Sequence, residues 1–264
     1  RGYFIAPQRM HHLIHDAIGE LHEGLGQYIN RVILPPRDPA VGADHVTWNV
    51  DQGPPSFDFV CWLVDQEMTR IREGAPAPLK VHFWTGHNGA FPVHGFVDNV
   101  MKPVLSLIGA VEDRTDVGGR FKDVFILRDV CKAVRAGEKP PVFRAPAAAK
   151  HAVAEHLKGR KPGTITLREK DKWISRNSQV EEWKKFAEKC DRKVIFIKDN
   201  EDCSLELHDR MKLYANAYLN MMVINGPLTL CLHSDAPYVS MRTIGCENSG
   251  STSPQQITRL TGIT

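Results

Sequence analysis

The 264-residue chain lacks three features that define large classes of proteins: long apolar runs, paired cysteines and a strong charge of one sign. Without the roughly 20 apolar residues needed to cross a bilayer, no transmembrane segment is expected. The six cysteines are scattered without a CxxC pair, which favours free, mostly buried thiols in the reducing cytoplasm. The formal net charge of +3 is too small to indicate nucleic-acid binding by itself.

Several signature motifs of catalysis and metal binding are also missing. The sequence has no GxSxG, no P-loop, no HExxH and no DxD element at a strand end. His11 and His15 have the i,i+4 spacing that can hold zinc, but with no third ligand the group His11, His12 and His15 is interpreted as a helix face. The acidic run 199–202 follows a predicted strand and is interpreted as a solvated loop. We therefore expect neither a metal ion nor another cofactor.

What the sequence does contain is an alternation of strands and helices, which is clearest in its second half. Strands are predicted at 163–167, 194–197, 222–224 and 238–241, and helices at 147–158, 179–189, 206–220 and 228–233. Strands that alternate with helices are typical of a parallel sheet covered on both faces.

The first half shows the same alternation less regularly. Its predicted helices are 8–29, 57–72, 96–108 (interrupted by Pro103) and 128–135, and its predicted strands are 31–34, 79–84 and 123–127. Residues 35–56 are rich in Pro, Gly and Asp and predict a long loop. The Pro-rich segment 136–146 predicts a linker and hinge. We expect two α/β lobes, residues 1–140 and 147–264, that meet at a cleft.

The most informative stretch is 163–183, where two arginines surround the end of a predicted strand. Arg168 ends the strand, and Arg176 precedes a helix that begins near Gln179. The carboxyl end of a strand in an open α/β sheet is where ligands bind, and guanidinium groups beside a helix start favour phosphate. The alternative is that Arg168 pairs at the surface with Glu169, Glu181 or Glu182. Asn177 or Ser178 is predicted to cap the helix, with Glu181 completing a capping box.

A second signal is Asn225-Gly226-Pro227, which follows a predicted strand and opens a predicted helix. Gly226 permits close approach of the backbone to a ligand, and Pro227 suits the first turn of a helix. Because both signals fall at carboxyl ends of strands in the same lobe, we expect them to lie at one edge of the sheet.

The order of these motifs (ITLRE, RNS, EEW, VIFIKD, HDRMKLYANAYLN and NGP) resembles the C-terminal donor lobe of GT-B-type glycosyltransferases over about residues 147–241. The resemblance implies two Rossmann-like lobes with mostly parallel sheets that face a cleft. It implies sugar transfer from a nucleotide sugar to an acceptor (a glycan, a lipid or a small molecule), without a metal. Arg168 and Arg176 would then hold the diphosphate, and the remaining substrate-binding residues would be Asn177, Ser178, Asn225, Gly226 and Pro227.

The general base is expected from the first lobe. His87 lies in the Gly-rich loop after the strand 79–84, and Asp98 lies at the start of the next helix, so either side chain could deprotonate an acceptor. Two alternatives stay open: an epimerase or hydrolase of nucleotide sugars, and a non-catalytic protein that binds a nucleotide or phosphate.

A basic stretch, residues 131–161, carries eight Lys or Arg against two Glu. It lacks the interleaved aromatic residues of a nucleic-acid surface, so we interpret it as a solvated linker and helix face. The sequence therefore argues against nucleic acid as a partner.

Overall fold

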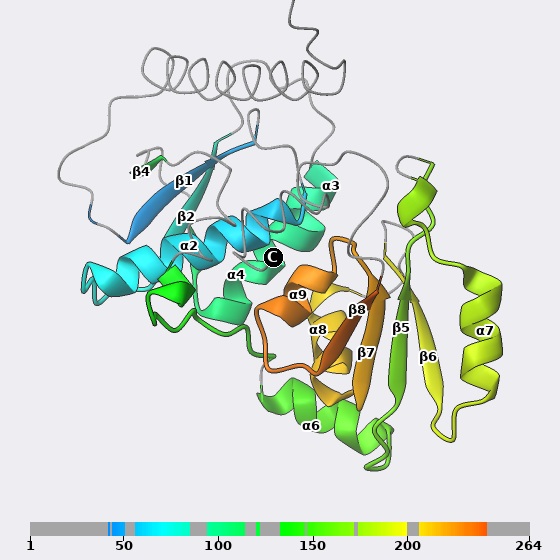
Figure 1. Cartoon of the computed structure of the whole chain (residues 1–264). Coiled ribbons are helices and arrows are strands. Elements are labelled where there is room, and N and C mark those ends of the chain that lie inside the picture. The colour runs from blue at the N-terminus through cyan, green and yellow to red at the C-terminus, as the bar shows by residue number, and fades with distance from the viewer. Residues whose placement is uncertain are drawn as a thin grey trace, which may run out of the picture.

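The computed structural model describes residues 42, 44–50, 56–84, 94–113, 120–121, 133–145, 147–171, 174–199 and 206–241. These residues form two four-stranded sheets in which every pair of neighbouring strands is parallel, with helices packed on them (Figure 1). The α/β class and the parallel sheets predicted from the sequence are therefore confirmed.

The second sheet has the strand order β6-β5-β7-β8. Its strands are β5 (Gly163–Leu167), β6 (Val194–Lys198), β7 (Leu219–Val223) and β8 (Tyr238–Met241). The helices that connect or precede these strands are α6 (Ala147–His156), α7 (Val180–Glu188), α8 (Leu207–Asn216) and α9 (Leu228–Leu232), and a 3-10 turn, η2 (Ile174–Arg176), follows β5. All eight elements predicted for this half are present, with ends that differ by a few residues.

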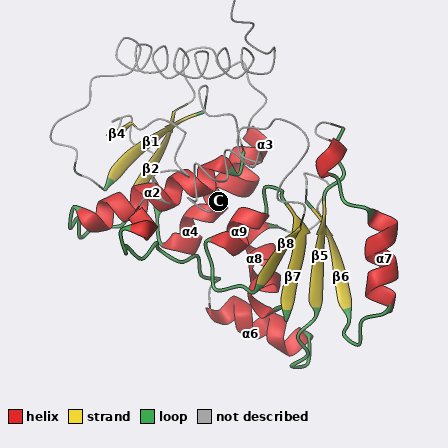
Figure 2. Ribbon diagram, viewed as in Figure 1, coloured by secondary structure: helices red, strands yellow, loops and turns green. Residues whose placement is uncertain are grey.

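The two faces of this sheet are covered by different helices (Figure 2). Met221 packs with Ile165 and Leu167 and, from α7, with Trp183. The next residue of β7, Met222, belongs instead to the cluster that contains Met211 of α8. This alternation follows from the two-residue period of a strand, which sends successive side chains to opposite faces.

The first sheet has the order β3-β2-β1-β4, with strands β1 (His45–Asn49), β2 (Lys80–Trp84), β3 (Val111–Asp113) and β4 (Arg120–Phe121). Helix α2 (Asp58–Arg72) follows β1, close to the predicted bounds. The prediction of a loop over all of 35–56 is wrong, because β1 is an inner strand of the sheet. Val46 and Trp48 of β1 are buried, and so is Val50 directly after the strand. Packing of these side chains stabilises the strand, and the turn-forming residues around it hide this pattern in the sequence.

The predicted break at Pro103 is also wrong. Helix α3 (His94–Phe96), the π-helical turn η1 (Val97–Met101) and helix α4 (Lys102–Ile108) run on without interruption. The amide of Lys102 donates to the Val97 carbonyl, five residues earlier, and this wider turn places Pro103 in the first turn of α4. A proline cannot donate to the carbonyl four residues earlier and its ring crowds that carbonyl, and the change from π-helical to α-helical turns at Lys102 accommodates both effects.

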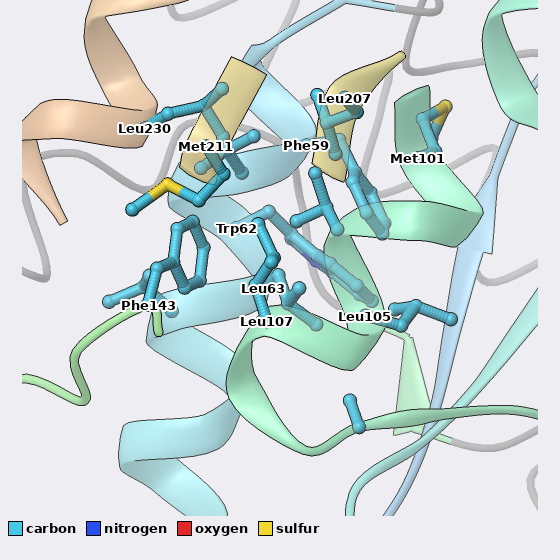
Figure 3. Close-up of a cluster of buried hydrophobic side chains, with 14 of the residues drawn as sticks. Phe59, Trp62, Leu63, Met101, Leu105, Leu107, Phe143, Leu207, Met211 and Leu230 are labelled. Carbon is cyan, nitrogen blue, oxygen red and sulfur yellow. The ribbon is translucent and has the colours of Figure 1, made fainter. Parts of the chain in front are cut away.

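The two sheets share one buried core. Helices α2 and α4 contribute Phe59, Trp62 and Leu105, and helices α8 and α9 contribute Met211 and Leu230 to the same cluster (Figure 3). The helical layers that belong to the two sheets are therefore packed against each other through apolar side chains.

The segment 136–146 connects the two sheets, and part of it is packed rather than free. Phe143 is 1% exposed, its amide donates to the His233 carbonyl over 2.6 Å, and it forms an isolated parallel bridge with Ser234. The amide of the next residue, Arg144, donates to the carbonyl of Leu107 over 2.9 Å. The connection is thus fixed both to α4 and to the turn after α9.

The predicted elements 8–29, 31–34 and 123–127 lie outside the described residues, and of the predicted helix 128–135 only 133–135 are described, as helix. Among the described helices, none combines the length and the apolar character required to cross a membrane.

Candidate anion-binding site at the carboxyl edge of the second sheet

The strand order of the second sheet defines where a ligand would bind. The chain passes from β5 to β6 on one side and then returns to place β7 on the other side of β5. The connections therefore leave β5 and β7 in opposite directions, and such a switch point is where open α/β sheets bind ligands, outside the carboxyl ends of the strands. Arg168 directly follows β5, and Asn225 lies two residues beyond β7.

Arg168 is 7% exposed and is held in place by both residues predicted beside it. Its amide donates to the Ser178 hydroxyl oxygen over 2.9 Å, and its carbonyl accepts from the Ser178 amide over 2.8 Å. The guanidinium Nη1 of Arg168 donates to the side-chain oxygen of Asn177. Asn177 also bonds both the amide and the carbonyl of Lys170, so the chain that leaves β5 is fixed over three residues.

The prediction that Asn177 or Ser178 caps helix α7 is wrong, because both side chains bond to residues 168–170. Helix α7 begins at Val180 after Gln179, whose side chain makes no capping bond. Asn177 and Ser178 use their side chains to hold the 168–170 segment instead. Glu181 and Glu182, which the sequence offers as partners for Arg168, form ion pairs of 2.8 Å with Lys184 and Lys185 along α7.

Arg176 joins the two predicted halves of the site. Its Nη2 donates to the carbonyl of Ile224 over 3.1 Å, directly before Asn225. Asn225 is 6% exposed and its side-chain oxygen accepts from the Leu228 amide over 3.1 Å. The structure thus brings Arg168, Arg176, Asn177, Ser178 and Asn225 to one edge, as the sequence predicts.

The interpretation of 199–202 as a solvated loop is wrong for Asp199, which is buried, and residues 200–202 lie outside the described residues. The strand register pairs Leu167 with Lys198, so the residues that follow these two, Arg168 and Asp199, are neighbours at the edge. Asp199 is 9% exposed, and its amide donates to the Leu167 carbonyl over 3.0 Å. Burial raises the pKa of the Asp199 carboxyl above its ordinary value, and nearby Arg168, Lys170, Arg210 and Arg176 oppose that rise.

Arg210 of α8 is a site residue that the sequence analysis missed. It is 4% exposed, and its Nη2 donates to the carbonyl of Lys198 over 3.1 Å, beside Asp199. A signal for it exists, since Leu207, Met211 and Tyr214 are buried along α8 and Arg210 lies on the same face at helical spacing. A buried guanidinium needs polar partners, and Arg210 finds one at the carboxyl edge of the sheet.

We call Arg168, Arg176, Asp199, Arg210 and Asn225 the carboxyl-edge cluster. Within the described part of the chain, the buried atoms Asp199 Oδ1, Arg210 Nε and Asn225 Nδ2 have no hydrogen-bond partner. Buried polar groups are usually satisfied, so a group of such atoms at one ligand-binding edge indicates a polar ligand. Three guanidinium groups against one carboxyl favour an anion.

Gly226 and Pro227 are positioned by packing. A Cβ on Gly226 would lie 2.3 Å from Cδ2 of Phe57, so the space beside Gly226 is occupied by an aromatic ring from the first half of the chain. Pro227 is buried and immediately precedes α9. The close backbone approach predicted at Gly226 is therefore made to Phe57.

Of the two predicted bases, His87 lies outside the described residues. Asp98 lies in η1, and its carboxylate is 2.8 Å from the Lys102 ammonium, which also contacts Glu112 at 3.1 Å. Over the described ranges, no three His, Cys, Asp or Glu side chains gather as a metal site would require; His11, His12 and His15 fall outside those ranges.

Comparison with known proteins gives no match: no family model matches the chain, and no curated protein or solved structure matches it.

Proposed function

We propose that the protein is a metal-independent glycosyltransferase that binds the diphosphate of a nucleotide sugar at the carboxyl-edge cluster. The observation that carries the proposal is the convergence of Arg168, Arg176 and Arg210 at the carboxyl ends of β5, β6 and β7, near Asp199. Guanidinium groups match phosphate oxygens in pairs, and the burial of Arg168 and Arg210 strengthens each such contact.

The position of the first sheet supports an acceptor side opposite the cluster, and hence two Rossmann-like lobes across a cleft. Phe57 lies between β1 and α2, near the carboxyl end of β1, and contacts Gly226 beyond the carboxyl end of β7. Phe57 also meets Phe96 edge to face at 5.6 Å. Segments that follow β1 and β2 thus approach the segment that follows β7, which is the arrangement that transfer between lobes requires.

The chemistry needs a site that stabilises the departing diphosphate. Negative charge on that group increases as its bond to the sugar breaks, and arginines fixed beforehand stabilise this charge without reorganising. Arg168 is fixed by Asn177 and Arg176 by the Ile224 carbonyl, so both are held before the ligand arrives. A base from the first half, Asp98 or His87, would deprotonate the acceptor.

The test measures binding and turnover in Arg168→Ala and Arg176→Ala. Nucleoside diphosphates and nucleotide sugars are first screened by thermal shift, and the affinity of the ligands that stabilise the parent is then measured by calorimetry. Each substitution should weaken binding, and loss of one charge-stabilising donor should lower kcat by about 10²–10³. Arg168→Lys should recover only part of the loss, because an ammonium cannot reproduce the guanidinium fork.

Arg192→Ala is the matched control. Arg192 is an exposed arginine of the same half that precedes β6, at the opposite end of the sheet, with its guanidinium 4.2 Å from the Tyr218 ring centre. Its removal should leave nucleotide affinity unchanged. If Arg168→Ala and Arg176→Ala lower only the melting temperature and bind nucleotides like the parent, the arginines serve the fold alone and the proposal fails.

A non-catalytic nucleotide-binding protein is the second candidate, and one observation favours it. The Asp98 carboxylate already pairs with the Lys102 ammonium at 2.8 Å, so it would have to leave this partner to deprotonate an acceptor. Nucleotide sugar that binds but is not consumed with any of a range of glycan, lipid and small-molecule acceptors would support this candidate.

A further inference from the structure

We propose that Asp199 recognises the ribose of the bound nucleotide by accepting a hydrogen bond from a ribose hydroxyl. The inference rests on the proposed function, because it requires a diphosphate on the neighbouring arginines. Asp199 would select a ribonucleotide over pyrophosphate or a deoxyribonucleotide, and the arginines alone cannot make this distinction.

The first argument is the burial of an unused acceptor. Asp199 is 9% exposed, and Oδ1 has no hydrogen-bond partner among the described residues. A carboxylate oxygen is costly to bury without a donor, and each such group in a native fold calls for an explanation. A donor supplied by a ligand is the simplest one at this edge of the sheet.

The second argument is its location beside the anion-binding arginines. Asp199 follows β6, the strand next to β5, and the register places it beside Arg168. Arg210 donates to the carbonyl of Lys198, the residue directly before it. Strands β6 and β7 flank β5, so a ligand whose phosphates bind Arg168 extends along the edge toward one of them. On the β6 side it would meet the buried acceptor Asp199 Oδ1.

The third argument is the mixture of donors and acceptors. Arg210 Nε and Asn225 Nδ2 are buried donors without a described partner, whereas Asp199 Oδ1 is a buried acceptor. Pyrophosphate offers oxygens that accept from the donors but repel a carboxylate. A ribose next to a diphosphate offers both kinds of group, and acidic residues that accept from ribose hydroxyls recur in nucleotide-binding α/β folds.

The experiment compares three probes on the parent and on Asp199→Asn and Asp199→Ala: inorganic pyrophosphate, the ribonucleoside 5′-diphosphates of the four common bases, and their 2′-deoxy and 3′-deoxy counterparts. Asp191→Asn is the matched control, since Asp191 is exposed and precedes the amino end of the same strand. Melting temperatures of all variants identify any that fail to fold, and the near-isosteric Asp199→Asn keeps the test valid if Asp199→Ala does not fold.

For the parent and Asp191→Asn, removal of the recognised hydroxyl should weaken binding roughly tenfold to a hundredfold, as for a hydrogen bond to a charged group. That preference should disappear in Asp199→Ala and shrink in Asp199→Asn. Pyrophosphate should bind both variants at least as tightly as the parent, because a repelling carboxylate has been removed.

The contrary outcomes are distinct. Pyrophosphate and all nucleotides failing to bind the parent would remove the proposed function itself. Nucleotides that bind with equal affinity in the ribo and deoxy forms, or a preference that survives in Asp199→Ala, would overturn the role of Asp199 and leave the arginine site intact. Weaker pyrophosphate binding in both Asp199 variants would show that the protonated carboxyl donates to phosphate, which also overturns the inference.

Discussion

Replacement of Gly226 by alanine tests whether the segments beyond the two sheets are packed as the structure has them. The new Cβ would lie 2.3, 2.8 and 3.0 Å from Cδ2, Cγ and Cε2 of Phe57. Carbon atoms in contact lie about 3.5–4.0 Å apart, so the ring must move by roughly 1 Å. The ring cannot move freely, because it packs on Phe96 at 5.6 Å.

The expected cost is that of overpacking alone. Gly226 is not among the glycines with positive φ, so alanine adds no backbone strain there. An extra methyl in a packed site costs about 1–3 kcal/mol of unfolding free energy. For a chain of this size, each kcal/mol corresponds to a fall of about 2–4 °C in Tm.

Gly95→Ala is the control, since no atom lies within 4 Å of the position that its new methyl group would take, and its φ is also ordinary. That change should be neutral or stabilising by up to about 1 kcal/mol, because alanine favours a helix. In a Phe57→Ala background the cost of Gly226→Ala should fall below about 0.5 kcal/mol, as the obstructing ring is absent. The cycle compares the free energies of unfolding of the parent, Gly226→Ala, Phe57→Ala and the double variant, each measured by denaturant unfolding. Equal costs of Gly226→Ala with and without the ring would refute the contact.

Two further predictions concern stability. Burial lowers the pKa of His233 from 6.5 to about 4, so the unfolded chain binds its proton first as the pH falls. Stability should therefore be complete above about pH 6.5 and decline toward pH 4 by up to about 3 kcal/mol, and His233→Gln should flatten this decline in urea titrations. Asn220 is fully buried, accepts from the Thr164 hydroxyl at 2.6 Å and donates to the carbonyls of Tyr214 and Pro237 at 2.9 Å. Asn220→Ala should cost about 2–4 kcal/mol, whereas Thr164→Val should cost less because it removes only one donor; equal costs in chemical denaturation would contradict this network.

The second sheet is predictable from sequence because its elements are locally consistent. Strand β5, Gly163–Leu167, is buried at every position, and a short run of β-branched and apolar residues between two helices is typical of an inner parallel strand. Strand β1 is harder, because its short alternation of Val46, Trp48 and Val50 lies among residues that favour turns. Its partner strands are distant in sequence, so only tertiary packing selects the extended conformation.

The candidate site divides in the same way. Arg168, Arg176 and Asn225 are predictable because each follows a strand whose end can be recognised. Asp199 begins an acidic run, and its burial results from neighbours on β5 and α8 that no local pattern reveals. Arg210 could also have been predicted, because it lies at helical spacing among the buried apolar residues of α8. A charged residue in such a position indicates a buried polar site, as a residue at a strand end does.

The shared core of α2, α4, α8 and α9 also constrains closure around a substrate. Opening the two sheets as a hinge would expose side chains such as Trp62, Phe143 and Leu230, which are fully buried. Each large apolar side chain costs about 1.5–3 kcal/mol to expose, and the cluster contains many. Shear, in which packed helices slide over one another by small amounts, keeps such surfaces covered. Any closure in this protein should therefore proceed by sliding at the helical layers rather than by bending at the connection that Phe143 anchors.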